Sequence, residues 1–422
     1  MANNEGFTGE EALNPAAQLF HAQCLNCYIV TIVGFKTKIN PNVIKPGLEH
    51  TLLKHPLFCS KIVDEKEGRN MKWTRTTVKL ENHVIVPNLD PDIKNPDQFV
   101  EDYVSNLTKN AMDMSQPSWE LHLLNIKTSD AGAVGVFRVH HSIGDGASLT
   151  SLLLASTRKT SNLEALPTFP IKKRAGPSTY SSKLWWLLSF WSVLRLICNT
   201  FVDFMLFVAT FFFLKDTQSP IKGAPRCDLT TKRFVYRIVS LDDIKLVKNV
   251  TNTAMAEMMK KGSKDKWGNE IGFVIVPLTI ALHGDPLDYI ERAKAKMERK
   301  KLSLEARCTF PFSNYVLKTF GVKAAAALTH TVFTNTTVAF SNVVGPLEEI
   351  SFIGHPIAFL APSIYGFPHA ITIHCQSYVN KMTIILAVDP NVVPHPHQLL
   401  DDIEESLQLI KDAALKRRSS KI

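Results

Sequence analysis

The sequence predicts an α/β protein of two lobes joined through an apolar helical segment. Its 422 residues are too many for one ordinary domain and suit two. Short β-branched runs and stretches with helical spacing mix irregularly on both sides of the middle of the chain, which is typical of an α/β fold. A composition of 45% hydrophobic and 21% charged residues excludes wholesale disorder and fibrous repeats.

Cysteine usage and net charge narrow the function classes. Seven cysteines are too few for a disulfide framework in so long a chain, so we expect a reducing compartment. The net charge of +9 suits an anionic ligand such as a CoA ester, or an anionic lipid. The chain has no zinc-finger spacing and no basic stripe interleaved with aromatic residues, so we expect no nucleic-acid partner. Cys24 and Cys27 are interpreted as core thiols rather than as a metal site.

The first lobe is expected at residues 1–160. Residues 27–35 are apolar and β-branched, which predicts a strand, and a turn at 129–132 separates two further apolar runs that we expect to form a hairpin. Leucines recur at helical spacing in two other stretches. The expected strands are 27–35, 121–126 and 134–139, and the expected helices are 41–55 and 147–155.

Residues 161–220 are expected to form a proline-containing linker that carries an apolar segment at 184–214. These 31 residues include only two charges, Arg195 and Asp203. As a helix they would extend about 45 Å, more than the ~30 Å hydrocarbon core of a bilayer. A charge near the middle of a spanning helix costs about 2.5–3.5 kcal/mol, and a helix lying in the interface avoids this cost. We expect membrane association and leave three structures open: a spanning helix, an interfacial helix and a buried core helix.

The second lobe is expected at residues 221–422, where α/β patterning resumes. Ser240, with Asp243 three residues later, is a capping signal for a helix. Apolar alternation and helical spacing predict the remaining elements. The expected strands are 234–239, 272–280, 334–343, 370–378 and 382–388, and the expected helices are 244–248, 287–301 and 397–415.

One motif carries chemistry, His140-His141-Ser-Ile-Gly-Asp145-Gly146, where a predicted strand gives way to a helix. A neutral imidazole can take a proton from an alcohol at cellular pH, and loops at strand ends often present catalytic groups. Asp145 can fold back onto the backbone of the turn, and a glycine such as Gly146 allows a ligand to approach closely. Adjacent strand residues face opposite sides, so a shared metal is not expected, although two structural histidines remain an alternative.

These residues match the HHxxxDG signature of acyl-CoA-dependent acyltransferases built like chloramphenicol acetyltransferase. Further matches follow in order along nearly the whole chain, and with them the sequence resembles the plant bifunctional wax ester synthase/diacylglycerol acyltransferases. The matching stretches are 14–16, 36–58, 117–120, 266–269, 340–346 and 374–378. The resemblance implies a two-lobed fold with the histidine motif in a tunnel between the lobes.

The resemblance also implies the activity and the roles of individual residues. His141 would be the general base that deprotonates the acceptor hydroxyl, with His140 beside it in the motif. Asp145 would shape the loop, and Gly146 would keep the substrate channel open. The expected substrates are a fatty acyl-CoA and either a long-chain alcohol, giving a wax ester, or a diacylglycerol, giving a triacylglycerol. We expect no cofactor and no metal.

The expected location is the endoplasmic reticulum membrane, with the plasma membrane as a second location and the catalytic lobe in the cytosol.

In one place the chain departs from the family pattern. The family continues from the region of residue 249 through an Asn-Asp motif on a helix and an arginine-containing strand, whereas this chain passes almost directly to residues 256–263. The second lobe is therefore expected to be shortened near 249–256. Two alternatives follow: a catalytically inactive membrane-associated homologue, and a soluble acyltransferase of secondary metabolism in which 184–214 is a core helix.

Overall fold

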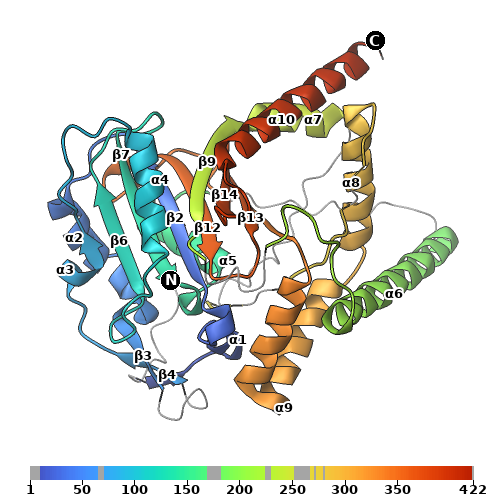
Figure 1. Ribbon diagram of the computed structural model, residues 1–422, viewed down its shortest axis with the longest axis horizontal. Helices are drawn as coiled ribbons and strands as arrows, with labels where there is room; N and C mark the ends of the chain where they lie inside the picture. Colours follow the sequence, from blue (N-terminus) through green and yellow to red (C-terminus); the bar gives the residue numbers. More distant parts are fainter. Residues whose placement is uncertain are drawn as a thin grey trace.

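The computed structural model describes residues 10–64, 71–168, 182–223, 230–250, 267–269, 272–278 and 281–420 (Figure 1). The largest of its sheets has seven strands, and its central strands are the apolar runs expected near the start of the chain. Pairing of β6 (Trp119–Leu124) with β7 (Ala133–His140) confirms the expected hairpin. In sheet order the strands are β5 (Val84–Ile85), β6 (Trp119–Leu124), β7 (Ala133–His140), β2 (Tyr28–Phe35), β12 (His355–Tyr365), β11 (Ile350–Phe352) and β8 (Thr157–Lys159).

Strand β12 joins the two halves of the chain. It comes from the second half but pairs antiparallel with β2 of the first, with Tyr365 opposite Tyr28. The sequence analysis did not expect this strand, because Pro356 and Pro362 interrupt its apolar run and proline is unusual inside a sheet. The lobe boundaries at 160 and 220 remain a prediction, but the main sheet takes strands from both sides of them.

A second sheet belongs to the later half of the chain. It contains the expected strands at 234–239, 370–378 and 382–388, whereas the strand expected at 334–343 begins four residues late because a helix runs through Thr334. Its order is β10 (Val338–Val343), β13 (Ile371–Tyr378), β14 (Lys381–Val388) and β9 (Arg233–Ser240). A small third sheet has the order β1 (Glu10–Ala12), β4 (Met71–Arg75) and β3 (Ser60–Asp64).

All five expected helices are present. Asn40 caps the first of them, but this helix ends at Glu49 rather than at residue 55, and short 3-10 turns follow it. The backbone N–H of Asp243 donates to Oγ of Ser240 at 3.4 Å, which confirms the expected cap. The confirmed helices are α2 (Pro41–Glu49), α5 (Gly146–Ser156), α7 (Leu241–Val250), α8 (Pro286–Lys301) and α10 (Pro396–Ser419). The helices α1 (Pro15–Leu19), α3 (Leu80–His83) and α4 (Pro96–Leu107) were not expected.

In the second lobe one expected strand was wrong and one helix was missed. The strand expected at 272–280 is not formed at 272–278, and residues 279 and 280 lie outside the described part. Instead the backbone N–H of Ile275 donates to Glu305, and Phe273 packs between helices, which uses its apolar surface without a sheet. The helix α9 (Glu305–Thr334) was missed, because Pro311 and Gly321 read as helix breakers; Gly321, at φ 83°, is where α9 kinks.

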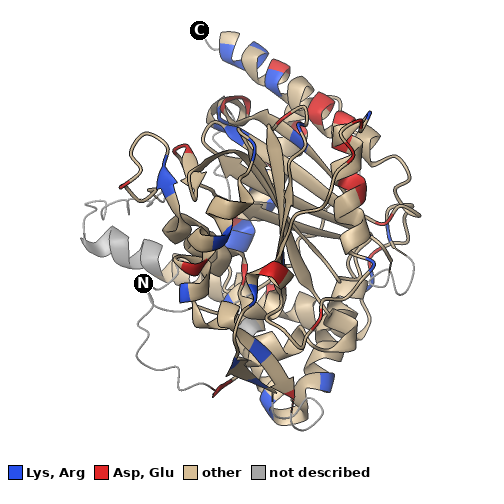
Figure 2. Cartoon of the chain, turned by 90° about the vertical axis from the view of Figure 1, so that its left-hand side faces the viewer, with Lys and Arg blue, Asp and Glu red and all other residues tan. Residues whose placement is uncertain are grey.

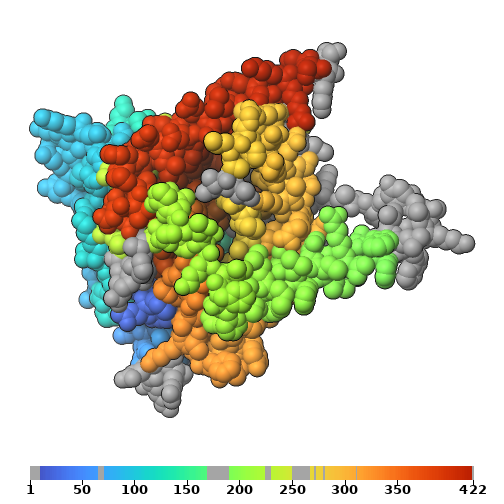
Figure 3. Space-filling view, turned by 45° about the vertical axis from the view of Figure 1, so that its right-hand side comes forward, coloured from blue at the N-terminus to red at the C-terminus, as the bar shows by residue number. Residues whose placement is uncertain are grey.

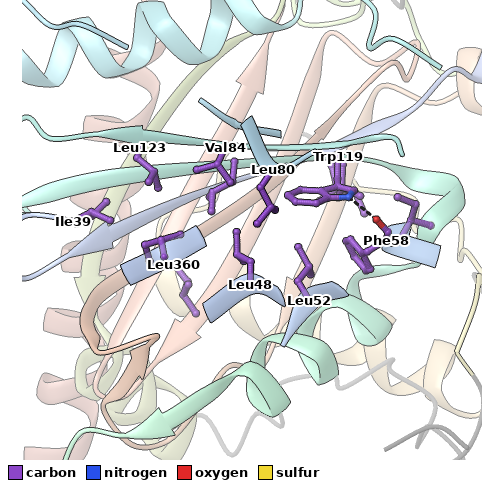
Figure 4. Close-up of a cluster of buried hydrophobic side chains, with 14 of the residues drawn as sticks. Ile39, Leu48, Leu52, Phe58, Leu80, Val84, Trp119, Leu123 and Leu360 are labelled. Carbon is purple, nitrogen blue, oxygen red and sulfur yellow. Dashed lines mark hydrogen bonds between the residues drawn. The ribbon is translucent and has the colours of Figure 1, made fainter. Parts of the chain in front are cut away.

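Both faces of the large sheet are buried. On one face Trp119 packs with Phe58 and Leu48 and donates its indole N–H to the Phe58 carbonyl at 2.9 Å (Figure 4). On the other face Val30 of β2 packs with α4 and with Ile385 of the second sheet. This second cluster therefore holds the two sheets together.

Charged side chains lie mainly outside the sheets. Figure 2 shows the long central strands mostly in tan, whereas charges of both signs lie on the helices, the loops and the short strands. Helix α10 ends in the basic residues Lys416, Arg417 and Arg418, which complement the negative C-terminal end of a helix dipole.

The apolar segment forms one long helix, α6 (Ser182–Phe212), as expected. Its part from Phe190 to Phe212 is long and apolar enough to cross a membrane, and within that stretch only Asp203, Phe207 and Thr210 are buried inside the chain. A core helix would be mostly buried. The alternative of a buried core helix is therefore wrong for the described residues, and the spanning and interfacial structures both remain.

Candidate active site

The motif residues lie where β7 ends and α5 begins. His140 is the last residue of β7, His141 opens a short 3-10 turn (His141–Ile143), and Gly146 is the first residue of α5. The backbone N–H of His141 donates to the Cys27 carbonyl at 2.9 Å, which ties the turn to the segment that leads into β2. The loop therefore starts from a rigid central strand of the sheet.

His140 is fully buried, and both of its ring nitrogens are engaged. Nδ1 lies 3.3 Å from the backbone N–H and 2.7 Å from the hydroxyl of Ser142. Because an N–H can only donate, Nδ1 accepts, so Nε2 carries the proton and donates to Oδ1 of Asn26 at 3.1 Å. The ring is thus held as a neutral, fully satisfied imidazole.

His141 has the opposite arrangement. The amide N–H groups of Asn269 donate to the carbonyl oxygens of His141 and Ser142, at 3.0 and 3.2 Å. This fixes the amide, so its oxygen faces the ring and accepts from Nδ1 of His141 at 3.1 Å. Nε2 then carries the lone pair, and no described residue forms a hydrogen bond with it.

Burial keeps both imidazoles neutral. It lowers the pKa of His141 below 6.5, while Asp145 and the bond to Asn269 act in the opposite direction. Burial lowers the pKa of His140 still further, and the neighbouring His21 and His141 add to the effect. A neutral His141 with a free Nε2 is chemically equipped to accept a proton.

Asp145 and Gly146 lie on the far side of the turn. The carboxylate of Asp145 caps α5 by accepting from the backbone N–H of Ser148 at 2.8 Å. A Cβ added to Gly146 would have no atom within 4 Å, so nothing within the described chain demands glycine there. Space is tight at Gly144 instead, where an added Cβ would lie 3.1 Å from Trp267.

Two aromatic rings of the N-terminal segment cover the histidine pair. Phe20 stacks on His141 with ring centroids 4.2 Å apart, and His21 stacks on His140 at 4.3 Å. Both follow α1, where Leu19 packs into the cluster formed by α6 and α9. The sequence analysis did not select Phe20, because an aromatic residue after a short helix carries no signal of its own.

The sequence analysis used segment 267–269 only for its resemblance to the family, yet in the structure this segment forms hydrogen bonds with the motif loop. Trp267 donates its indole N–H to the Ile143 carbonyl at 2.6 Å. Gly268 has φ 148°, a conformation that glycine adopts most readily, and its carbonyl accepts from the hydroxyl of Ser148 at 3.0 Å. Asn269 is the functional residue that spacing alone could not reveal, since it lies 128 residues from His141. Lys266 of the same stretch lies outside the described residues.

A further buried histidine, His374 of β13, lies in electrostatic range of His141. Burial, assisted by repulsion from His141, lowers the pKa of His374 to about 4. Its Nδ1 lies 3.4 Å from the hydroxyl of Ser363 on β12. Among the described residues, no three His, Cys, Asp or Glu side chains converge as metal ligands.

Family comparisons cover most of the chain. Residues 48–203 match the wax ester synthase/diacylglycerol acyltransferase catalytic domain. Residues 267–411 match the WS/DGAT C-terminal domain. The histidine motif lies within the first match and Asn269 within the second, so the contact between them joins two regions that the family models describe separately.

A curated relative, wax ester synthase/diacylglycerol acyltransferase 11 of Arabidopsis thaliana, is 45% identical over 467 aligned positions, which cover 97% of this chain and 96% of the relative. Since 97% of 422 residues is about 409, about 58 of the aligned positions have no counterpart in this chain. The predicted shortening near 249–256 concerns residues that lie, from 251 on, outside the described part.

Solved structures share the fold. A wax ester synthase/diacylglycerol acyltransferase from Marinobacter aquaeolei VT8 matches with a TM-score of 0.59 at 17% identity, covering 96% of this chain and 99% of that chain. The first condensation domain of the calcium-dependent antibiotic synthetase matches at 0.62 and 12% identity, over 97% of both chains. A variant of the rhizomide synthetase starter condensation domain, in complex with C8-CoA and Leu-SNAC, matches at 0.56 and 11%, over 97% of this chain and 95% of that one. The expected fold class is confirmed.

Proposed function

Because the chain belongs to the wax ester synthase/diacylglycerol acyltransferase family, we propose that it moves a fatty acyl group from acyl-CoA to a long-chain alcohol, and also to diacylglycerol. The general class, acyltransferase, follows from this membership. The acyl donor is supported by the positive net charge and by the C8-CoA bound to a structural neighbour. The chain would need no resident cofactor, since acyl-CoA is a substrate.

His141 acts as the general base in this proposal. The acceptor hydroxyl donates a hydrogen bond to Nε2, which takes the proton as the oxygen attacks the thioester carbonyl. The tetrahedral intermediate then collapses, the carbon–sulfur bond breaks, and the imidazolium returns the proton to the departing CoA thiolate. Base assistance of this kind contributes about 10²–10⁴-fold, and positioning of the two substrates supplies much of the rest.

The observation that carries this proposal is the free Nε2 of His141 opposite an Nδ1 held by Asn269. His140 has no free ring nitrogen in the described structure, so we assign it a supporting role in which it fixes the backbone of the turn. Asp145 holds the start of α5. Gly146, exposed at the first turn of α5, is proposed to leave room for substrate.

The test is acyl transfer from radiolabelled palmitoyl-CoA to hexadecanol and to diacylglycerol, using membranes from a host deficient in neutral lipids. We expect ester formation by the chain, and a loss of at least 10²-fold in His141→Ala. The matched control is His50→Ala, which removes an exposed histidine and should retain full activity. Full activity of His141→Ala would exclude the proposed base.

We further propose that the protein works at the endoplasmic reticulum membrane, with the plasma membrane as a second site and the catalytic lobe facing the cytosol. The exposed apolar surface of α6 supports a membrane location, because long-chain alcohols and diacylglycerols dissolve in lipid. Carbonate extraction and co-localisation with an endoplasmic reticulum marker test it. Recovery of the protein in the soluble fraction would contradict it.

A second candidate is a catalytically inactive homologue that still associates with membranes. The absence of counterparts for about 58 aligned positions of the Arabidopsis relative favours it. A chimera that carries the missing residues of that relative separates the two candidates. If the chain as it stands gives no ester and the chimera does so in a His141-dependent way, the inactive homologue is correct.

A further inference from the structure

Helix α6 exposes a continuous apolar stripe. Phe201 is 62% exposed and Trp191 is 63% exposed, although both are large and apolar. At 100° per residue, the stripe members fall within about half of the helix circumference. They are Phe190, Trp191, Leu194, Ile197, Phe201, Val202, Met205 and Phe212. Figure 3 shows much of the length of α6 uncovered by neighbouring elements, with one end of the helix projecting beyond them. Large apolar side chains exposed together in this way mark an interaction site.

The opposite side of α6 is bound to the rest of the second lobe by charge. Asp203 is fully buried, and its Oδ1 lies 2.7 Å from Arg299 and 2.9 Å from Lys300 at the end of α8. Lys300 in turn lies 2.7 Å from Glu305 at the start of α9. Near this cluster Asn199 donates to the Leu302 carbonyl at 3.1 Å.

This cluster favours the interfacial structure of α6 over the spanning one. Asp203 lies near the middle of the apolar stretch Phe190–Phe212, so a spanning α6 would carry the four charged groups of the cluster into the hydrocarbon core. Charged groups there are costly, and α8 and α9 would have to enter the bilayer with them. A helix that lies on the surface keeps the cluster inside the folded lobe and turns only the stripe toward lipid.

Exposed basic residues lie on α6 and on the segments next to it. Arg195 is exposed at the rim of the stripe, Lys215 is exposed just beyond the end of α6, and Lys318 and Lys323 are exposed on the neighbouring α9. Cations beside an apolar stripe complement a lipid surface that contains anionic headgroups, each adding to the attraction near the membrane. A second copy of the same stripe would instead bring like charges together.

We infer that α6 docks in the plane of an anionic lipid surface, with its stripe in the acyl region and its Asp203 side held against α8 and α9. This inference rests on the membrane location proposed above and names the geometry of that association. It also places the motif-bearing lobes on one side of the membrane, beside the surface from which a lipid acceptor would be drawn.

Binding to vesicles tests the docking face. Flotation with phosphatidylcholine vesicles containing one third phosphatidylserine should capture the full-length chain, and Phe201→Ser/Val202→Ser should weaken binding at least tenfold. The matched control is Leu409→Ser/Leu415→Ser, which removes two exposed apolar residues from α10 and should bind as the parent does. Equal binding by all three proteins would overturn the inference. So would a dimer in sedimentation velocity that the α6 substitutions convert to monomer.

Labelling tests the orientation. In a Cys198→Ser background, which removes the exposed cysteine of α6, single cysteines replace Ser192 near the start of the stripe and Thr217 beyond its end. A membrane-impermeant maleimide should label both from outside sealed microsomes if α6 lies on the surface. If only one of the two sites is labelled before detergent is added, and the other becomes labelled afterwards, α6 spans the membrane and the inference is overturned. Vesicle binding through α6 by a protein without transferase activity would contradict the proposed enzyme but not this geometry.

Discussion

Oδ1 of Asn269 lies 3.1 Å from Nδ1 of His141, and this contact determines which ring nitrogen is available for chemistry. The amide is itself fixed by two backbone carbonyls of the motif loop, so the imidazole cannot change tautomer without losing a bond. A neutral amide in this place orients the ring and stabilises its charged form less than a carboxylate would.

Replacing Asn269 by leucine should therefore impair catalysis more than binding. The side chain keeps a similar volume but loses its bonds to the loop, so both tautomers become accessible and the ring is less well oriented. We expect kcat to fall about 10²-fold, with a smaller change in KM. The control Ser148→Ala removes a hydroxyl bonded to Gly268 in the same segment without touching His141, and it should retain most activity. Comparable losses in both variants would indicate a general disruption of the loop.

The acid side of the pH–rate profile should report His141. Burial lowers the pKa of His141, and only the neutral form can accept a proton, so kcat/KM should be constant above about pH 6.5 and fall as pH drops further. The profile is measured between pH 5 and 8 with palmitoyl-CoA and hexadecanol. The residual rate of His141→Ala should lack this acid limb. A midpoint above pH 7 in the parent would show that the imidazole is charged in the resting site.

Phe20 should act by positioning His141, since its ring stacks on the imidazole at 4.2 Å. Phe20→Ala opens space beside His141 and admits water, and we expect kcat to fall about tenfold, with Phe20→Tyr close to the parent. The measurement is the split between kcat and KM at saturating acyl-CoA. If both variants change KM alone, Phe20 contacts substrate rather than orienting the base.

Acid should destabilise the fold through its buried histidines, of which His374 is an example. Its pKa is about 4 in the folded chain and near 6.5 when unfolded, so between these values the unfolded state binds more protons. Stability is therefore present above pH 6.5 and is lost as pH falls, by about 2 kcal/mol for this histidine between pH 7 and 5. Chemical denaturation at both pH values should show a smaller loss in His374→Gln than in the parent. The exposed His50→Ala variant should match the parent.

Much of the fold could be predicted from sequence because local patterns dictated it. The β-branched alternation of β2 and β9 and the spacing in α5 and α8 are signals within ten or so residues. Strand β12 and helix α9 could not be read in this way. Prolines and glycines inside them signal breaks, and tertiary pairing with β2 or packing against α6 overrides that local signal.

The same distinction between local and distant contacts applies to the candidate active site. The motif loop was recognisable because its residues are consecutive, whereas its partners come from distant parts of the chain. Asn269 reaches His141 because its segment bonds to the motif loop, and Phe20 reaches it because α1 packs on α6 and α9. The strand expected at 272–280 failed for a related reason, since Phe273 finds an apolar partner in Phe207 of α6 rather than in a neighbouring strand.

The ionic cluster under α6 should contribute strongly to the free energy of unfolding. Lys300 bridges two buried carboxylates, Asp203 and Glu305, so Lys300→Met leaves Glu305 without its cation. Breaking a buried pair from one side costs about 3–5 kcal/mol, and we expect a loss of this size in the free energy of unfolding, measured by denaturant titration in mild detergent.

Arg299→Met is the matched comparison, because Arg299 is partly exposed and its removal leaves Lys300 in contact with Asp203. We expect it to cost about 1 kcal/mol. Replacing Asp203, Lys300 and Glu305 together by leucine, methionine and leucine should recover much of the loss, since a dry apolar contact needs no desolvation of charge. If Lys300→Met is as stable as the parent, the cluster does not hold α6 to α8 and α9, and the surface orientation of α6 loses its main support.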